Sequence, residues 1–127
     1  MKKGFGKINS KLDTIQDPQF RKAVEKAFQS QRLFLVASEL TEALEYIRKH
    51  DFKPLGSELK RVIEESDGEY FIENFELFVK DTYPDELADS SIRLMDIAGG
   101  EEIDLEWYIV QKLRYNKTRA KMHGKKF

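Results

Sequence analysis

Cysteine is absent from the chain, which excludes disulfide bonds and thiolate metal sites. An excess of charge is also missing, because 22 basic and 23 acidic residues give a net charge of -1. Balanced charge gives no bulk attraction to nucleic acid, so we expect no stable nucleic-acid binding. No apolar run is long enough to span a bilayer, and the basic N-terminus lacks the apolar segment of a signal peptide. These absences predict a soluble, cytoplasmic protein that does not engage membranes.

Motifs of several common enzyme classes are missing as well. The two histidines, His50 and His123, form no H-E-x-x-H or E-x-x-H pattern, which disfavours zinc hydrolase and di-iron sites. The sequence has no Walker A loop, no G-x-G-x-x-G and no nucleophile elbow. What is present is a chain of 127 residues, 40% of them hydrophobic, which is enough for one folded domain with its own core.

The first half of the chain reads as an arm, a helical stretch and a long connection. Residues 1–16 form an arm with little periodicity, and a single domain follows over 17–127. Asp17-Pro18 is typical of a helix start, and helical pattern continues to about His50, as one helix or as two that meet near 29–31. The connection over 51–80 carries a short helix at 58–65, and we interpret its ambiguous segment 70–81 as helix.

Helix signals in the second half complete an all-α fold. Thr82 resembles an N-cap, with Asp85 three residues later, and the helix after it ends at Gly99-Gly100. Asp104 caps a last helix that continues to about Lys121. The expected architecture is an all-α helical bundle of four to five helices.

Carboxylates recur at a spacing of three residues in the stretch "SELTEALEYIRK". On a helical wheel Glu39 and Glu42 fall outside the polar arc, on a flank shared with Leu35 and Tyr46, whereas Glu45 points toward solvent. That flank is expected to be partly buried, where a carboxylate is costly unless it is paired or binds a cation. The expected apolar stripe of the same helix is Leu33, Val36, Leu40, Ala43, Leu44 and Ile47.

A second acidic pair occupies the helix after Pro84. Glu86 and Asp89 lie one turn apart on a flank that also carries Arg93. Four carboxylates on two facing helices would form an all-oxygen site, which suits a hard cation such as Mg²⁺, with Mn²⁺ as a substitute. A single E-x-x-E pair is common on solvated helix faces, so this prediction depends on the presence of two.

Basic and amide side chains follow in the last helix. Lys112, Asn116 and Arg119 are spaced i, i+4 and i+7 and share one face, which suits phosphate binding. Taken alone, such a stripe is more typical of a solvated surface.

Together, "LVASELTEALEYIRK" and "KDTYPDELADSSIRLMDIAGGEEIDLEWYIVQKLRYNKTRAKMHGKKF" resemble the MazG-like all-α nucleoside triphosphate pyrophosphohydrolases. The hallmark is a helix with E-x-x-E, here Glu39 and Glu42, followed by a helix with E-x-x-D, here Glu86 and Asp89. The resemblance covers about residues 32–50 and 79–127. The chain departs from the family in its longer 51–80 connection, and in Ser38, where many members have another acid.

The resemblance implies a Mg²⁺-dependent hydrolase that cleaves a nucleoside triphosphate or its deoxy form to the monophosphate and pyrophosphate. It implies metal binding by Glu39, Glu42, Glu86 and Asp89, and assembly as a homodimer or a dimer of dimers. The proton acceptor stays open among these carboxylates and Glu45, so the catalytic candidates are Glu39, Glu42 and Glu45. Arg93, Lys112, Asn116 and Arg119 are the candidate phosphate and substrate contacts. The alternative is a non-enzymatic helical interaction module, in which acids and basic stripe pair with each other across a dimer interface.

Overall fold

The structure, a computed structural model, describes residues 12–123, and their side chains as far as Arg119. Within this part of the chain there are five helices and no strand, which confirms the all-α prediction. Most of the arm predicted at 1–16 lies outside the described residues. In its described part Leu12 is buried, and Asp13 Oδ1 accepts a 2.6 Å hydrogen bond from Arg21. This end of the arm therefore lies against the start of the first described helix.

Helix α2 (Pro18–Lys49) is one continuous helix of 32 residues. Asp17 caps it as predicted, because its Oδ1 accepts a 3.0 Å bond from the backbone N–H of Gln19. The weak stretch at 29–31 does not interrupt the helix. Ser30 directs its hydroxyl to the carbonyl of Lys26, one turn back, at 2.8 Å, so its polar group is satisfied inside the helix. Arg48 and Lys49 in the last turn complement the negative end of the helix dipole.

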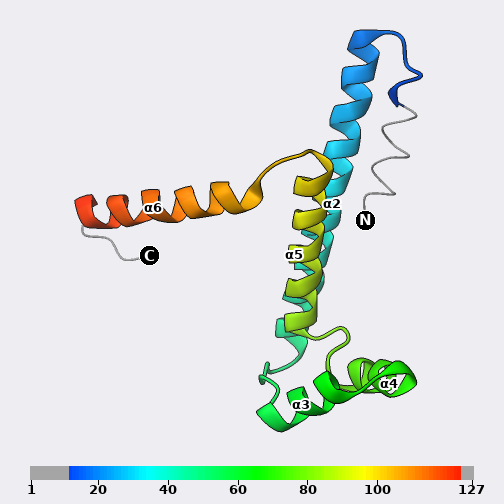
Figure 1. The fold of residues 1–127 in the computed structure, drawn as a ribbon, viewed down its shortest axis with the longest axis vertical. Coiled ribbons are helices and arrows are strands. Elements are labelled where there is room, and N and C mark those ends of the chain that lie inside the picture. The colour runs from blue at the N-terminus through cyan, green and yellow to red at the C-terminus, as the bar shows by residue number, and fades with distance from the viewer. Residues whose placement is uncertain (1–11, 124–127) are drawn as a thin grey trace.

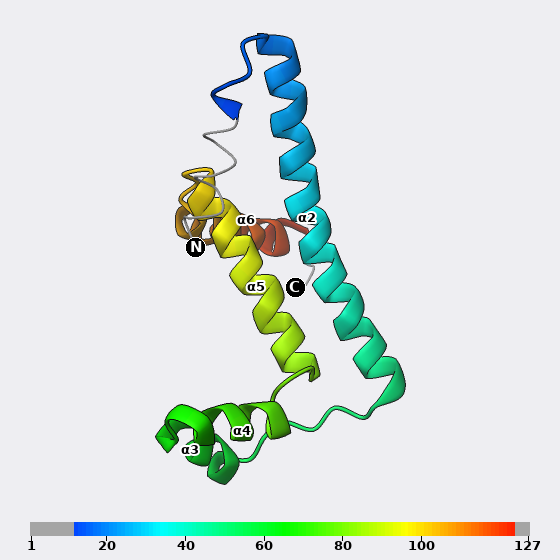
Figure 2. The same cartoon turned by 90° about the vertical axis from the view of Figure 1, so that its right-hand side faces the viewer.

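The long connection at 51–80 folds into two short helices. Helices α3 (Ser57–Glu65) and α4 (Gly68–Phe78) pack against each other at one end of the molecule (Figure 2). The ambiguous segment at 70–81 is thus helical up to Phe78. The rings of Phe52 and Tyr83 meet edge to face at 5.5 Å, which ties the connection to the start of the next helix.

Helix α5 (Tyr83–Gly100) begins and ends where the sequence predicts, with different capping contacts. Thr82 is the N-cap residue, but its hydroxyl donates to the carbonyl of Val79 at 2.6 Å. Asp85 Oδ2 instead accepts from the backbone N–H of Asp81 at 2.9 Å. At the other end Glu102 takes a left-handed φ of 57°, and Ile103 N–H reaches the Ala98 carbonyl at 2.8 Å, as in a Schellman motif.

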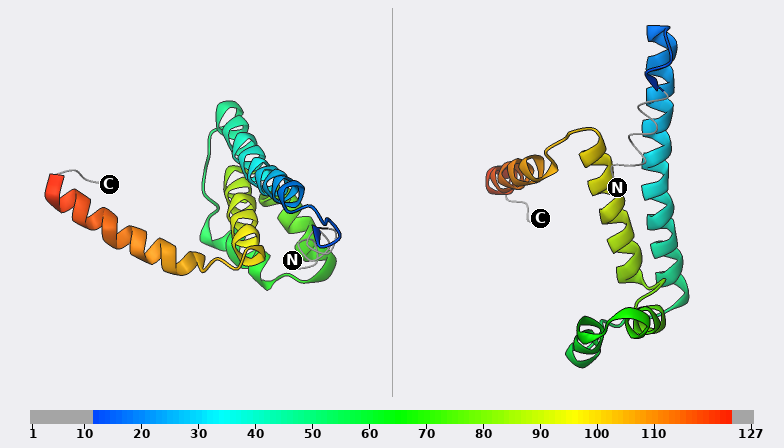
Figure 3. Two further views of the ribbon diagram at one scale, coloured as in Figure 1. Left: turned by 90° about the horizontal axis from the view of Figure 1, so that it is seen from above. Right: turned by 45° about the vertical axis from the view of Figure 1, so that its right-hand side comes forward.

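Helix α6 (Leu105–His123) begins after Asp104, whose Oδ1 accepts a 3.2 Å bond from Trp107 N–H. It extends away from α2 and α5 in Figures 1 and 3. Helices α2 and α5 lie antiparallel, side by side, and α3 packs against α4, whereas α6 makes no comparable contact in the described chain. No helix among the described residues has the length and apolar character needed to cross a membrane.

The small core lies between α2 and α5 and includes only part of the apolar stripe expected on α2. Val36 and Ala43, two members of that stripe, are buried in α2, and Ala98 is buried in α5. The rest of the predicted stripe is exposed in the single chain, because α5 packs along the neighbouring flank. The exposed members are Leu33, Leu40, Leu44 and Ile47.

Candidate metal centre

The flank of α2 that carries acids is the flank packed against α5. Glu39 lies one turn after buried Val36 and one turn before buried Ala43, and its side chain is only 14% exposed. Tyr46 on the same flank is half-buried, whereas Leu35 and Glu42 are exposed. Partial burial of the acidic flank, expected from the helical wheel, is therefore confirmed for Glu39 and Tyr46.

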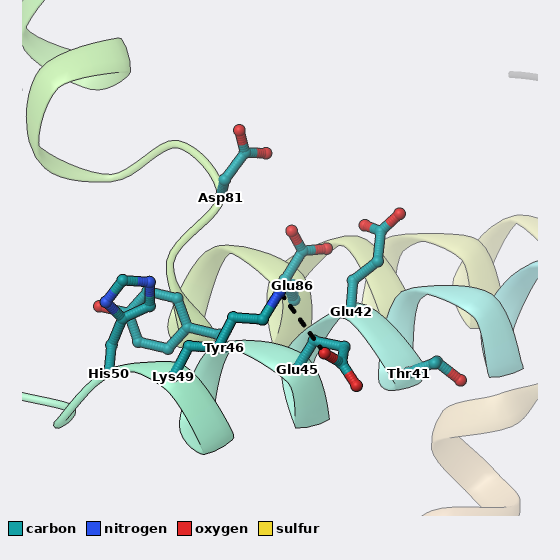
Figure 4. Close-up of a pocket in the computed structure, with 8 residues that line it drawn as sticks. All are labelled: Thr41, Glu42, Glu45, Tyr46, Lys49, His50, Asp81 and Glu86. Atoms are coloured by element: carbon teal, nitrogen blue, oxygen red, sulfur yellow. Dashed lines mark ion pairs between the residues drawn. The ribbon is translucent and has the colours of Figure 1, made fainter.

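Three of the predicted carboxylates come together across this helix pair. Glu39 and Glu42 of α2 and Glu86 of α5 each offer a carboxylate oxygen, and these atoms all lie within 4.8 Å of one another. Figure 4 shows Glu42 and Glu86 extending from their two helices to the same side. We call these three residues the carboxylate cluster. Two helices that are far apart in sequence thus supply one concentrated set of oxygen ligands.

Glu86 is the buried member of the cluster. It is only 4% exposed, and its Oε2 is buried with no hydrogen-bond partner in the described structure. Burial, together with the neighbouring carboxyl groups of Glu42 and Glu39, raises the pKa of Glu86 from 4.5 to about 7. A buried carboxylate oxygen without a partner is costly, so this atom calls for a proton or a cation.

Asp89 lies one turn after Glu86 but outside the tight group of three. It is half-buried, and burial raises its pKa, helped by the charges of Asp85 and Glu39 and opposed by that of Arg93. Asp89 therefore interacts electrostatically with Glu39 of the carboxylate cluster. The structure thus groups three of the four predicted metal ligands, with Asp89 at their side.

Arg93 contacts the carboxylate cluster directly. Its Nε donates to Glu39 Oε1 at 2.9 Å, which joins α5 to α2. Sequence reasoning assigned Arg93 to phosphate, and its side chain remains 42% exposed next to this pair. The guanidinium is therefore positioned by Glu39 while part of it stays accessible.

Glu45, the third catalytic candidate, is turned away from Glu42 and Glu86 (Figure 4). Its carboxylate pairs with Arg48 at 3.3 Å and with Lys49 at 3.7 Å, both on the same helix. Glu45 therefore belongs to an ion-pair network along α2 and not to the carboxylate cluster.

An open depression of about 420 Å³ lies beside the cluster and includes two of its members. Polar and charged groups surround it, which is compatible with a hydrated, charged ligand. Its lining residues are Thr41, Glu42, Glu45, Tyr46, Lys49, His50, Asp81 and Glu86 (Figure 4).

The predicted phosphate contacts of α6 are not brought to the carboxylates within the single chain. Lys112 and Arg119 instead lie over the ring of Tyr115, at 5.1 and 5.9 Å from its centroid, and Asn116 is half-buried beside them. The three residues do share one side of α6, as their spacing predicts. Their separation from the cluster follows from the way α6 leaves the helix pair (Figure 1).

Sequence reasoning missed a second group of acids. Asp81, Asp85 and Glu86 also offer oxygen atoms within 4.8 Å of one another. Asp85 was expected only as a capping residue, and nothing in the sequence placed Asp81 in a site. The sequence feature that could have indicated this group is the density of acids around Thr82-Tyr83-Pro84. These acids had been interpreted only as part of a helix cap.

No protein-family model matches the chain, and comparisons with curated proteins and with solved structures give no significant match. The resemblance to MazG-like pyrophosphohydrolases therefore stays a prediction, and the argument for function depends on the geometry of the helix pair.

Proposed function

We propose that the chain is a Mg²⁺-dependent nucleotide pyrophosphohydrolase, which cleaves a nucleoside triphosphate, ribo or deoxy, to the monophosphate and pyrophosphate. Support comes from the order of acidic pairs in the sequence and from the meeting of Glu39, Glu42 and Glu86 across α2 and α5. A cytoplasmic location belongs to the same proposal and remains an expectation from the sequence.

One observation carries the proposal: the buried Glu86 Oε2 has no hydrogen-bond partner, although it lies in a group of three carboxylates. A group of this kind is all oxygen and strongly negative, which is the donor set that Mg²⁺ and Mn²⁺ prefer. The residues present therefore fit the cation. Glu39, Glu42 and Glu86 would hold it, with Asp89 in reach of the same site.

A bound divalent cation would supply charge neutralisation for phosphate oxygens and a lowered pKa for a coordinated water. The chain's own groups would do the rest. Arg93, held by Glu39, has an exposed part that can contact a phosphate oxygen. The proton of the attacking water would pass to Glu42, whose carboxylate pairs with no cation among the described residues. Glu39, paired with Arg93, and Glu45, paired with Arg48 and Lys49, are the less favourable acceptors.

A homodimer, alone or as part of a dimer of dimers, belongs to the proposal because large apolar faces are uncovered in the single chain. Leu33, Leu40, Leu44 and Ile47 form one exposed face of α2. Helix α6 is apolar along much of its exposed length, including Trp107. Contiguous apolar surface of this kind marks an interaction site, and a second copy would cover α2 and support α6.

Helix lengths allow α6 to supply the phosphate contacts in such an assembly. Glu86 lies fourteen residues before the end of α5, and Arg119 lies fourteen residues after the start of α6. Both spans are about 21 Å of helix. An α6 folded back antiparallel to α5 of the same chain, at the loop between the two helices, would therefore bring Arg119 level with Glu86.

The Arg93–Glu39 pair favours the second candidate, a helical interaction module whose acids and bases pair with each other. Thermal melting during a Mg²⁺ titration separates the two. The enzyme is expected to gain stability with Mg²⁺, because a ligand that binds only the native state raises the free energy of unfolding. A melting temperature that does not respond to Mg²⁺ or Mn²⁺ would favour the interaction module.

A further inference from the structure

A second acidic group adjoins the carboxylate cluster and shares one residue with it. Asp81 lies in the turn before α5, and Asp85 and Glu86 lie in the first turn of the helix. Each offers an oxygen atom, and the three atoms lie within 4.8 Å of one another. Asp81 and Asp85 stand outside the two acidic pairs that the sequence pattern singles out, so this group needs an explanation of its own.

The turn before α5 holds this group in place. Asp81 adopts a left-handed φ of 63°, and its backbone N–H donates to Asp85 Oδ2 at 2.9 Å. The carboxylate of Asp81 has no hydrogen bond or ion pair among the described residues, and it is exposed to solvent. Both oxygens of Asp81 and Oδ1 of Asp85 are therefore available to a ligand.

Glu86, which this group shares with the carboxylate cluster, supplies the sign of a ligand. It is 4% exposed, its Oε2 has no partner, and its carboxylate is placed between those of Asp81 and Glu42 (Figure 4). A carboxylate has lone pairs on two oxygens, so one side chain in this position can serve ligands on both sides. Burial without a partner is costly for a charged group, and an acidic neighbour on each side increases that cost.

We propose that Asp81, Asp85 and Glu86 bind a second divalent cation next to the one assigned to the carboxylate cluster, with Glu86 bridging the two ions. This inference rests on the proposed function only for the first ion. Two divalent ions about 3.5–4 Å apart and joined by a carboxylate form a common arrangement in phosphate-cleaving sites. The all-oxygen donor set suits Mg²⁺ or Mn²⁺.

Charge balance supports two ions over one. The two groups together hold five carboxylates, Glu39, Glu42, Asp81, Asp85 and Glu86, and Arg93 is the cation that contacts them. Lys49 lines the same depression but pairs with Glu45. With all five carboxylates ionised, four negative charges remain, and a single divalent ion would balance only half of them.

Binding of Mn²⁺ to the full-length chain, followed by electron paramagnetic resonance, tests the second site without any assay of turnover. The wild type is expected to bind a pair of Mn²⁺ ions per chain that show magnetic coupling. Asp81→Asn keeps the shape of the side chain, and asparagine is well tolerated at positive φ, so the turn is preserved. This variant is expected to lose one ion per chain together with the coupling. Asp85→Asn provides a second variant, and Asp67→Asn is the matched control, because exposed Asp67 lies in neither group.

The outcomes separate this inference from the proposed function. A single uncoupled ion that is lost in Glu42→Gln but retained in Asp81→Asn would overturn the second site and leave the first standing. Full Mn²⁺ occupancy with coupling in both Asp81→Asn and Asp85→Asn would also overturn it. A wild type that binds no Mn²⁺ would contradict both sites.

Discussion

Arg93 of α5 holds Glu39 of α2 through a 2.9 Å bond from Nε to Oε1. The pair sits at one side of the carboxylate cluster, so Glu39 is neutralised by the protein itself, whereas Glu42 and Glu86 pair with no cation in the described chain. The three carboxylates therefore differ in what they require. Glu39 helps to fix the two helices, and the negative charge left for a metal ion is concentrated on Glu42 and Glu86.

Removal of Arg93 tests the first of these roles. Without metal, Arg93→Ala is expected to lower the free energy of unfolding by about 1–2 kcal/mol, because it leaves a mostly buried carboxylate unpaired. The free energy of unfolding of Arg93→Lys should lie between those of wild type and Arg93→Ala. Arg61→Ala, at an exposed position of α3, is the control. Saturating Mg²⁺ should reduce the deficit, since the ion can take over the charge of Glu39. Urea unfolding with and without Mg²⁺ measures these differences, and equal stability of Arg93→Ala and wild type would refute the structural role.

The pKa of Glu86 predicts how stability depends on pH in the absence of metal. Because the folded-state pKa is about 7 and the ordinary value is 4.5, the folded state holds its proton more tightly than the unfolded state. The stabilisation of the fold by the proton on Glu86 is complete below about pH 4.5 and is lost as the pH rises through about 7. The free energy of unfolding is expected to fall by on the order of 3 kcal/mol over this range. The raised pKa of Asp89 acts in the same direction.

Glu86→Gln should remove most of this pH dependence and should be more stable than wild type at pH 8 without metal. Chemical denaturation between pH 5 and 8 in a chelator measures both quantities. Parallel pH profiles for the two proteins would show that Glu86 does not titrate in this range. Excess Mg²⁺ should flatten the wild-type profile, because the cation stabilises the charged carboxylate.

Glu42 and Glu45 are one turn apart on α2, and the proposed function predicts that Glu42 contributes more to turnover than Glu45. Glu42→Gln should reduce turnover by about two orders of magnitude or more, as expected when a ligand of the catalytic ion is removed. Glu45→Gln should have a smaller effect, since its carboxylate already pairs with Arg48 and Lys49. Glu64→Gln on α3 is the control for loss of one negative charge. A larger loss in Glu45→Gln than in Glu42→Gln would reverse the assignment and make Glu45 the proton acceptor.

Substitutions in α6 can distinguish a phosphate-binding role of its basic residues from a role as a solvated surface. Arg119→Lys keeps the charge but loses the planar fork that grips phosphate oxygens in pairs, so we expect impaired triphosphate turnover with a nearly unchanged melting temperature. Lys112→Ala should raise KM if its contact is equal in the ground and transition states. Arg114→Lys on the same helix, where Arg114 pairs with Gln111, is the matched control. Normal kinetics in both Arg119→Lys and Lys112→Ala would place the phosphate contacts elsewhere.

The uncovered face of α2 predicts the effect of a charge on assembly. Leu40 is 48% exposed in the single chain, so Leu40→Glu should disturb the fold of the chain little but disrupt a dimer that buries this face. Light scattering is expected to give a dimer mass for wild type and a monomer mass for the variant. Leu77→Glu, at a 74% exposed position of α4, is the control. A wild type that remains monomeric at high concentration would contradict the predicted dimer.

Local signals in the sequence were sufficient to predict the helices. Asp17-Pro18, Thr82 and Asp104 mark helix starts because capping depends on neighbouring residues alone. The stretch 18–49 contains no glycine, so a single helix could form through Gln29-Ser30-Gln31. The contact made by Thr82 was harder to predict, because its hydroxyl bonds back to Val79 in the turn that sets up Asp81.

Tertiary placement explains what the sequence left unpredicted. A helical wheel ranks faces by apolarity, and by that measure Leu40 and Leu44 should face a partner helix. Helix α5 instead packs along the flank of Glu39, where its own Arg93 supplies the neutralising charge. Asp81 joins the second acidic group from a turn in which its backbone takes a left-handed φ, which no spacing rule reveals. Helix α6 makes few contacts with the other helices of the described chain, so no packing pattern in the sequence predicts its position.

Release of pyrophosphate from nucleotides tests the central claim most directly. The purified full-length chain would be incubated with canonical and damaged nucleoside triphosphates, ribo and deoxy, in Mg²⁺, in Mn²⁺ and in excess chelator. The proposed function predicts equal amounts of monophosphate and pyrophosphate from at least one nucleotide, dependence on the divalent ion, and near-complete loss in Glu42→Gln. Release of inorganic phosphate instead, activity that survives the chelator, or no turnover of any nucleotide would contradict it.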